Sequence, residues 1–420
     1  MKLYQREWRS DKVDRLFVRD RSVYNVIRFY KVHDNKQINS INKCQLNYYR
    51  CCFEMKVLLL SPLVDFSGNF ATVTRIKKGL EKKGLRCFLK CSLKLSRSED
   101  LKDTLDELGI DIILAVHVYK SGKILIDVKI PYILILGGTD VNELTSDHEK
   151  MDIMTKAVNN SRHIVAFGES LAVKFKSCWP NYDPMNVSII PQGVEVFPNS
   201  FSITSYIKNH AKDIVTEQEG QPNCLYGCDT DLLIRQLSKS ECKIFTIVGG
   251  IRSVKNPLFL IKTFSDWRMK QGKVTCWLLF VGAHQNDTFF EKFKEEVRRC
   301  PGVVYIPALS TEDAHALIQD SFALVNCSDS EGMALAILEA MALKTLVIAR
   351  NIPGNTAVVD DGQNGIVFDT PENFIEKVEN LLEAPEIIKR ITEEAFNYIS
   401  NKHSVANEEN AYFSLLTKYC

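Results

Sequence analysis

The sequence predicts two α/β domains, each built on a doubly wound parallel sheet. Short apolar runs alternate with helical patterns from residue 55 onward, and the same rhythm returns after residue 241. Strand runs such as Ile112–Val116 are apolar at every position, which is typical of parallel strands covered by helices on both faces. A chain of 420 residues is long enough for two such domains.

The first half predicts an N-terminal Rossmann-like domain over residues 55–200. The run after Met55 begins a typical buried first strand. Apolar runs predict strands near residues 56–60, 86–90, 111–117, 131–136, 162–167 and 187–190. Helical spacing of apolar residues predicts helices over 71–83 and 99–108.

The second half predicts a C-terminal Rossmann-like domain over residues 242–400. Strands are expected near residues 243–249, 275–281, 303–306, 322–326, 345–349 and 366–368. Helices are expected near residues 257–270, 287–299, 311–319, 332–343 and 371–383. The polar segment 201–241 between the domains predicts a linker with a partly disordered insertion. Ligands bind beyond the carboxyl ends of such strands, so the cleft between the domains is the predicted site.

Residues 1–54 differ in character from the rest of the chain. They carry 12 Lys and Arg against 6 Asp and Glu, with little periodicity. We interpret them as a poorly ordered N-terminal extension or an upstream addition, and a basic targeting or membrane-surface arm is the alternative. No apolar run approaches the roughly 20 residues of a spanning helix, so no transmembrane segment is expected. A cytoplasmic location follows by default, with a secretory one open if the true N-terminus differs.

Composition excludes several classes of partner. The formal net charge of +1 argues against nucleic acid, which favours a strongly basic face. The 13 cysteines form no pair of Cys-x-x-Cys motifs and no Cys/His set at zinc spacing. We therefore expect free core thiols and no metal site.

The most informative segment is Ser328–Met341, which follows an apolar strand and opens a predicted helix. Gly332 lets a ligand approach the backbone, and the free amide groups of a helix start suit a diphosphate. Glu331 and Glu339 are eight residues apart, which on one continuous helix is a rise of roughly 12 Å. The two carboxylates of a glycosidase lie about 5–10 Å apart. The pair is therefore interpreted as gripping two parts of an elongated ligand.

The pattern Glu-x(7)-Glu, with Gly after the first Glu and Ala-Met after the second, resembles the family-4 retaining glycosyltransferases of GT-B fold. The resemblance covers residues 55–420 except the insertion. It implies a nucleotide-sugar donor, with UDP or GDP as nucleotide. It implies Glu331 at the sugar hydroxyls, Glu339 at the ribose, and Gly332, Met333 and Ala334 beside the donor. It also implies a C-terminal helix, within 401–420, that crosses back to the N-terminal domain.

A second segment, Gly249–Pro257, follows a strand and precedes a helix. In the resembled family an Arg and a Lys at this place hold the donor diphosphate, which implies this role for Arg252 and Lys255, with Gly250 beside the donor. The family form commonly spaces them five apart, whereas here they are three apart. A solvated basic turn is the alternative.

The resemblance implies further contacts, each with a plainer alternative. Gly68 would approach the donor and Asn69 the acceptor. The alternative is an ordinary turn between strand and helix, which would have the same sequence pattern. His117 would lie near donor sugar and acceptor, or be a simple edge histidine. Asp140 would bind acceptor hydroxyls, or cap the following helix. Gly282 would lie near the nucleotide base.

The sequence thus predicts a retaining glycosyltransferase with a nucleotide-sugar donor and an unknown acceptor. The resemblance implies that the leaving diphosphate helps deprotonate the acceptor. We expect no metal-binding Asp-x-Asp motif and no cofactor site; the Asp-x-Asp run of the chain, Asp229-Thr230-Asp231, lies in the polar segment 201–241. The alternative is a catalytically inactive glycosyltransferase-like protein that only binds a ligand. A nicotinamide dehydrogenase is disfavoured because no Gly-x-Gly-x-x-Gly follows the first strand of either domain.

Overall fold

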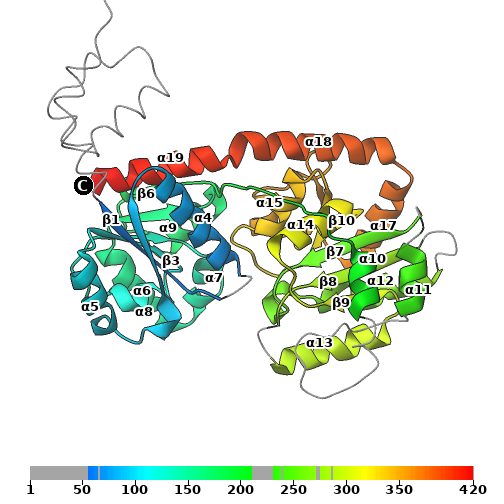
Figure 1. Cartoon of the computed structure of the whole chain (residues 1–420), viewed down its shortest axis with the longest axis horizontal. Helices are drawn as coiled ribbons and strands as arrows, with labels where there is room; N and C mark the ends of the chain where they lie inside the picture. The colour runs from blue at the N-terminus through cyan, green and yellow to red at the C-terminus, as the bar shows by residue number, and fades with distance from the viewer. Residues whose placement is uncertain are drawn as a thin grey trace, which may run out of the picture.

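The computed structural model describes residues 55–64, 67–210, 230–237, 239, 241–270, 275–284 and 287–419. The extension predicted for residues 1–54 lies outside this part of the chain. Two α/β domains lie side by side, the first in blue to green and the second in green to orange (Figure 1). The predicted fold class is confirmed.

The first domain is a parallel sheet of six strands in the order β2-β1-β3-β4-β5-β6. Its strands are β1 (Lys56–Ser61), β2 (Arg86–Cys91), β3 (Ile112–Val116), β4 (Tyr132–Ile135), β5 (His163–Ala166) and β6 (Val187–Ile189). Its helices are α4 (Gly68–Lys82), α5 (Glu99–Leu108), α6 (Gly122–Leu125), α7 (Gly138–Asn142), α8 (His148–Asn160) and α9 (Glu169–Cys178). Strand β3 is buried along its whole length, as its apolar run predicts.

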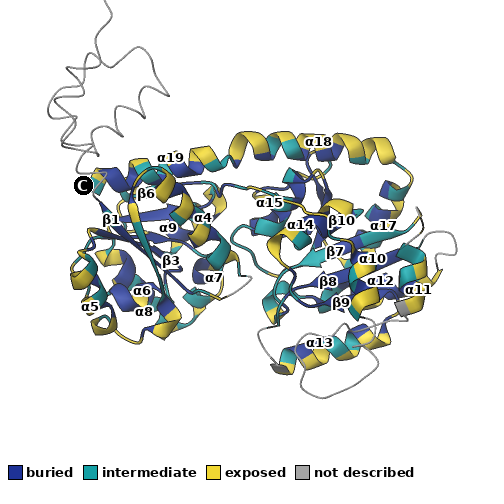
Figure 2. Ribbon diagram, viewed as in Figure 1, coloured by how far each residue is buried: buried dark blue, intermediate teal, exposed yellow. Residues whose placement is uncertain are grey.

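The second domain repeats the design with strand order β12-β11-β10-β7-β8-β9. Its strands are β7 (Lys243–Val248), β8 (Cys276–Val281), β9 (Val303–Ile306), β10 (Ala323–Asn326), β11 (Leu346–Arg350) and β12 (Ile366–Phe368). Its helices include α12 (Leu258–Lys270), α13 (Asp287–Arg299), α14 (Thr311–Asp320), α15 (Leu335–Ala342), α16 (Pro353–Thr356) and α17 (Pro371–Leu382). Both sheets form the buried centres of their domains (Figure 2).

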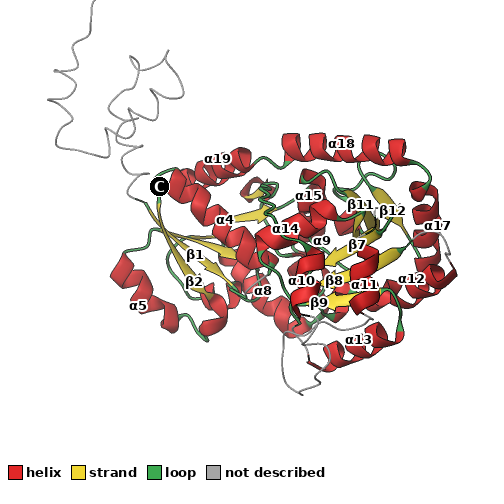
Figure 3. Cartoon of the chain, turned by 45° about the vertical axis from the view of Figure 1, so that its right-hand side comes forward, coloured by secondary structure: helices red, strands yellow, loops and turns green. Residues whose placement is uncertain are grey.

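The segment predicted as a linker with an insertion contains two helices in its described part, α10 (Ile203–His210) and α11 (Thr230–Leu237). Ile207 and Leu233 are fully buried and belong to one apolar cluster with Trp277 and Leu279 of β8. These helices therefore belong to the second domain and cover one face of its sheet (Figure 3). The polar composition of the segment hid this because only a few apolar residues make the contact.

Two helices at the C-terminus join the domains along one side. Helix α18 (Pro385–Lys402) packs on α15 of the second domain, and α19 (Val405–Leu416) packs on α4 of the first (Figure 1). Tyr412 and Leu416 are buried in the core of the first domain. Arg75 of α4 adds a two-pronged ion pair to the buried Glu408 carboxylate, at 2.7 and 2.9 Å. The chain therefore crosses between the domains twice.

Candidate active site

The carboxyl ends of the two sheets face each other, and their loops touch at one point. A Cβ on Gly138 at the start of α7 would lie 2.2 Å from the amide nitrogen of Gly332. Asn142 of the same helix donates a hydrogen bond of 3.3 Å to the main-chain oxygen of Glu331. Only glycine at both positions allows the two backbones to come so close. Gly332 thus serves the contact between the domains.

Glu331 lies at this junction, in the loop after β10, with 9% of its side chain exposed. Its carboxylate forms an ion pair with Lys255 and accepts hydrogen bonds from Ser328 Oγ at 2.6 Å and Asn326 Nδ2 at 3.3 Å. Burial by itself raises the pKa of Glu331, but the Lys255 ammonium and the hydrogen bonds more than offset it, so the pKa lies below its usual value. Glu331 is therefore an anion held in place by side chains from two loops.

Arg252 and Lys255 are brought together by a single turn of 3₁₀ helix, Ser253–Lys255, of which Arg252 is the N-terminal cap. Such a turn has three residues per turn, so their shorter spacing places the two cations one turn apart. Lys255 reaches Glu331. The Nε of Arg252 is buried and has no hydrogen-bond partner within the described ranges. An unpaired buried donor of this kind suits an anion.

His117 and Asp140 form a buried pair at the edge of the first sheet. His117 adopts the left-handed conformation, with φ of 76°, directly after β3. Its Nδ1 lies 2.5 Å from Asp140 Oδ1. The carboxylate also accepts hydrogen bonds from the amide groups of Gly137, Val118 and Tyr119, at 2.9, 2.7 and 3.2 Å. Asp140 therefore fixes the turn that carries His117.

This geometry bears on the two interpretations of Asp140. The residue is fully buried, and burial by itself raises its pKa. The charge and hydrogen bond of His117, with the amide groups, more than offset burial, so its pKa lies below the usual value. A fully buried carboxylate occupied by main-chain amides does not reach acceptor hydroxyls, so the capping interpretation is the one that fits.

Glu339 lies on α15, with 18% of its side chain exposed. The expectation of one continuous helix from Glu331 to Glu339 is wrong, because α15 begins at Leu335 and Ala334 has extended backbone angles. The 12 Å rise therefore does not describe their separation. Ala334 is the N-cap of α15, and no side chain caps this helix start. Met333 packs against apolar clusters of both domains.

The remaining predicted residues are placed as follows. Gly68 and Asn69 open α4, whose cap is Ser67, while Asp65 and Phe66 lie outside the described residues. Neither Gly68 nor Asn69 makes a hydrogen bond to the second domain in the described part of the chain. A Cβ on Gly282 would lie 2.0 Å from the main-chain oxygen of Gly249, so the Gly249-Gly250 turn packs directly on Gly282. A nucleotide contact for these residues stays a prediction.

Sequence reasoning missed four polar residues near the junction. Asn326 and Ser328 support Glu331, and Asn142 reaches it from the other domain. Lys120 is half-buried, and its pKa is lowered first by burial and then by the positive charge of Arg252. Two cations from different domains thus lie close enough to repel each other. Asn326 could have been found, because it ends a predicted strand at the cleft edge.

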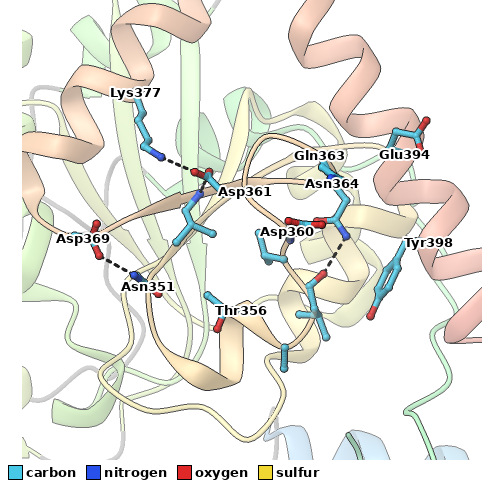
Figure 4. A pocket seen from close by; sticks show the side chains of 14 residues that line it. Asn351, Thr356, Asp360, Asp361, Gln363, Asn364, Asp369, Lys377, Glu394 and Tyr398 are labelled. Atoms are coloured by element: carbon cyan, nitrogen blue, oxygen red, sulfur yellow. Dashed lines mark hydrogen bonds and ion pairs between the residues drawn. The ribbon is translucent and has the colours of Figure 1, made fainter. Parts of the chain in front are cut away.

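A cavity of about 680 Å³ lies elsewhere, between the segment after β11 and α18 (Figure 4). None of the predicted site residues lines it. Its polar side chains bond to one another, as in Lys377 with Asp361 at 3.0 Å and Asn351 with Asp369 at 2.9 Å. It is therefore a polar surface hollow separate from the junction at Glu331.

Among the described residues, no group of three or more His, Cys, Asp or Glu side chains could hold a metal ion. The helices described are all too short or too polar to cross a bilayer.

Comparison with known proteins now decides the family. The profile of the Glycosyl transferases group 1 family matches residues 229–398. Glycosyltransferase 1 domain-containing protein 1 from Xenopus tropicalis is 32% identical over 363 residues, which cover 86% of this chain and 97% of that protein. The chain belongs to the group 1 glycosyltransferases.

Solved structures of low identity support the fold of this glycosyltransferase. Anabaena HepE in complex with UDP-glucose aligns with a TM-score of 0.67 at 13% identity, covering 87% of this chain and 100% of that one. Sucrose-phosphate synthase from Thermosynechococcus elongatus aligns with a TM-score of 0.64 at 14% identity, covering 87% and 99%. Both similarities concern the fold alone.

Proposed function

We propose that this glycosyltransferase moves a sugar from a nucleotide-sugar donor to an acceptor with retention of anomeric configuration. The observation that carries the proposal is the junction of Arg252, Lys255 and Glu331 at the carboxyl edge of the second sheet. It combines a buried unpaired guanidinium nitrogen, an ammonium and a held carboxylate. That set matches a ligand with a diphosphate and a hydroxyl-bearing ring.

The proposed donor lies along the second domain. Arg252 and Lys255 bind the diphosphate, with the uncapped start of α15 beside it. Glu331 accepts hydrogen bonds from the sugar hydroxyls, and Glu339 from the ribose. UDP and GDP are the expected nucleotides, and a complex with UDP-glucose is known for the HepE neighbour. The acceptor enters over the first domain, where His117 lies.

The proposed reaction needs no protein nucleophile. The bond between the anomeric carbon and the diphosphate oxygen breaks, and the electron pair leaves with the diphosphate. The acceptor oxygen bonds to the same face of that carbon, and its proton passes to a diphosphate oxygen. Arg252 and Lys255 stabilise the charge that develops on the leaving group. We also propose that no metal ion takes part in the reaction.

A thermal-shift screen tests the donor assignment. The purified protein is heated with UDP, GDP, UDP-glucose, GDP-mannose and other nucleotide sugars. A ligand at 100 times its Kd stabilises a protein by about 2.7 kcal/mol, which is easily measured as a rise in Tm. We expect at least one nucleotide and its sugar conjugate to raise Tm.

Two further measurements complete the test. The Lys255→Ala variant should lose the shift, whereas Lys262→Ala on the exposed side of α12 should keep it. The anomeric configuration of the product, read by NMR, checks retention. If no nucleotide or nucleotide sugar stabilises the wild-type protein, the proposed function is wrong.

A further inference from the structure

The Glu339 carboxylate has a buried histidine beside it that no prediction from sequence included. His315 lies on α14, which packs against α15, and its side chain is 2% exposed. Its Nε2 lies 3.5 Å from Glu339 Oε1. Its Nδ1 accepts a hydrogen bond of 3.1 Å from the main-chain amide of Phe197. The histidine therefore lies between the segment 190–202, which connects the two domains, and Glu339, the residue predicted to bind the ribose.

These contacts decide where the proton of the imidazole lies. A nitrogen that accepts an amide N–H carries a lone pair, so Nδ1 is unprotonated and the neutral ring carries its proton on Nε2. That proton faces Glu339. The 3.5 Å distance is longer than an ordinary hydrogen bond, and Nε2 has no hydrogen-bond partner elsewhere among the described residues. Nε2 is therefore a buried donor without a hydrogen-bond partner in the described part of the chain, 3.5 Å from one oxygen of a carboxylate.

The connecting segment 190–202 contacts α14 at a second point. Asn199 Nδ2 donates a hydrogen bond of 2.7 Å to Asp313 Oδ1, two residues before His315. Val194 and Val196 pack against the apolar cluster that contains α15. The first crossing between the domains is therefore held against the same two helices that carry His315 and Glu339.

We propose that His315 is a positioning residue for Glu339. A small shift of either side chain on ligand binding lets Nε2 donate to one carboxylate oxygen. This contact fixes the carboxylate's orientation toward the ribose hydroxyls and links it to the interdomain segment through Phe197. This rests on the proposed function, in which Glu339 binds the ribose. Indirect partners of this kind matter because an unoriented carboxylate loses part of its hydrogen bonding to the ligand.

A pair of substitutions separates the two ends of the imidazole. In His315→Asn the side-chain oxygen can take the place of Nδ1 and accept from Phe197, but no donor reaches Glu339. In His315→Gln the amide nitrogen can take the place of Nε2 and donate to Glu339, but the acceptor for Phe197 is lost. The Kd of UDP and of GDP is measured by isothermal titration calorimetry at a temperature where each variant is folded.

We expect His315→Asn to weaken binding of the nucleotide about tenfold, and His315→Gln to stay within about threefold of wild type. In a Glu339→Ala background the effect of His315→Asn should vanish, because the double-mutant cycle isolates the pair. A merely structural role would give the same loss in both backgrounds. Equal losses in the two His315 variants, or a loss that persists without Glu339, would overturn the proposal.

A measurement on the wild-type protein covers the case in which a variant fails to fold. The nitrogen-15 shifts of the His315 ring report the tautomer, and we expect the Nε2–H form. The Nδ1–H form would overturn the proposal. If wild type binds neither UDP nor GDP, the proposed function fails and this inference fails with it. If wild type binds, Glu339→Ala binds measurably more weakly, and His315→Asn binds as wild type does, only this inference fails.

Discussion

Where the two domains meet, each holds a buried carboxylate beside a basic side chain, and they hold it differently. In the first domain Asp140 accepts three main-chain amide groups and contacts His117. In the second domain the donors to Glu331 among the described residues are all side chains, those of Lys255, Ser328 and Asn326. Main-chain amides cannot rotate away from their acceptor, whereas side chains can. The Asp140 carboxylate is therefore a fixed part of the first domain, whereas the Glu331 carboxylate can exchange its partners for a ligand.

The basic side chains of the two domains differ in the same way. His117 is fixed by Asp140, whereas Arg252 has a buried nitrogen without a partner in the described ranges. Lys120, from the first domain, lies near enough to Arg252 to have its pKa lowered by that charge after burial is counted. We infer that the second domain binds the negative charge of the donor diphosphate, and that the first domain forms a rigid surface facing it.

The largest effect is expected from Lys255→Ala. This change removes a cation from the proposed leaving group and leaves the Glu331 carboxylate with only neutral partners. Loss of one charge-stabilising group commonly costs about 10²–10³ in kcat, and we expect a loss in that range. The rate of sugar transfer from the donor found by screening is the measurement.

The matched control is Lys262→Ala, which removes a lysine paired at 2.8 Å with Asp266 on the surface of α12. It should leave the transfer rate unchanged. If Lys255→Ala transferred sugar as fast as this control, the second domain would not hold the charge of the donor.

The next effect concerns stability and the first domain. Asp140→Ala should lower the free energy of unfolding by about 3 kcal/mol, because it removes the acceptor of one buried and two half-buried main-chain amide groups. Urea unfolding measures it. Asp152→Ala, which breaks an exposed pair with Lys156, should change stability by less than about 0.5 kcal/mol. Equal losses of unfolding free energy in the two variants would mean that Asp140 is not a fixed structural part of the first domain.

Asp140 also predicts a dependence on pH. Its pKa in the folded protein is below the ordinary value of 3.8. The stability that it contributes is therefore fully present above pH 3.8 and is lost as the pH falls through the lower folded value. Unfolding free energies measured between pH 5 and pH 2 should fall in wild type. In Asp140→Asn they should fall less steeply, and an unchanged slope would contradict the assignment.

The sequence was most informative where the chain is regular. Buried strands such as Ile112–Val116 declare themselves because every residue is apolar, and the helix Glu99–Leu108 has the predicted bounds. The pairing of Lys255 with Glu331 could be expected in outline, since both follow strands that end at one edge of a sheet. Local pattern and parallel topology together were sufficient for these features.

The sequence was least informative where a loop decides a distance or a contact joins distant residues. The break of the helix at Leu335 depends on extended backbone at Ala334, which no apolar period reveals. The partners of Asp140 are main-chain amides, which carry no sequence signal. Lys120 and His315 are ordinary in sequence and gain meaning only from residues 132 and 24 positions away, Arg252 and Glu339.

The smallest effect is expected at the contact between Gly138 of the first domain and Gly332 of the second. In Gly138→Ala the new Cβ would lie 2.2 Å from the amide nitrogen of Gly332 and 2.5 Å from its Cα, so the domains must separate slightly. Both atoms are main chain and cannot rotate aside. We expect kcat/KM to fall about tenfold, since small displacements of reacting groups are costly. The stability of each domain should change little, because alanine suits the first turn of α7.

Steady-state kinetics with the screened donor, together with the radius of gyration from small-angle X-ray scattering, measure the Gly138→Ala effect. Thr145→Ala, on the segment after α7, removes atoms instead of adding them and should keep kcat/KM near that of wild type. A larger radius of gyration together with a reduced kcat/KM would show that the close contact of Gly138 with the loop of Glu331 is needed for catalysis. Unchanged kcat/KM in Gly138→Ala would mean that the contact between the two glycines is not made during catalysis, and the fixed first domain would then act on the acceptor alone.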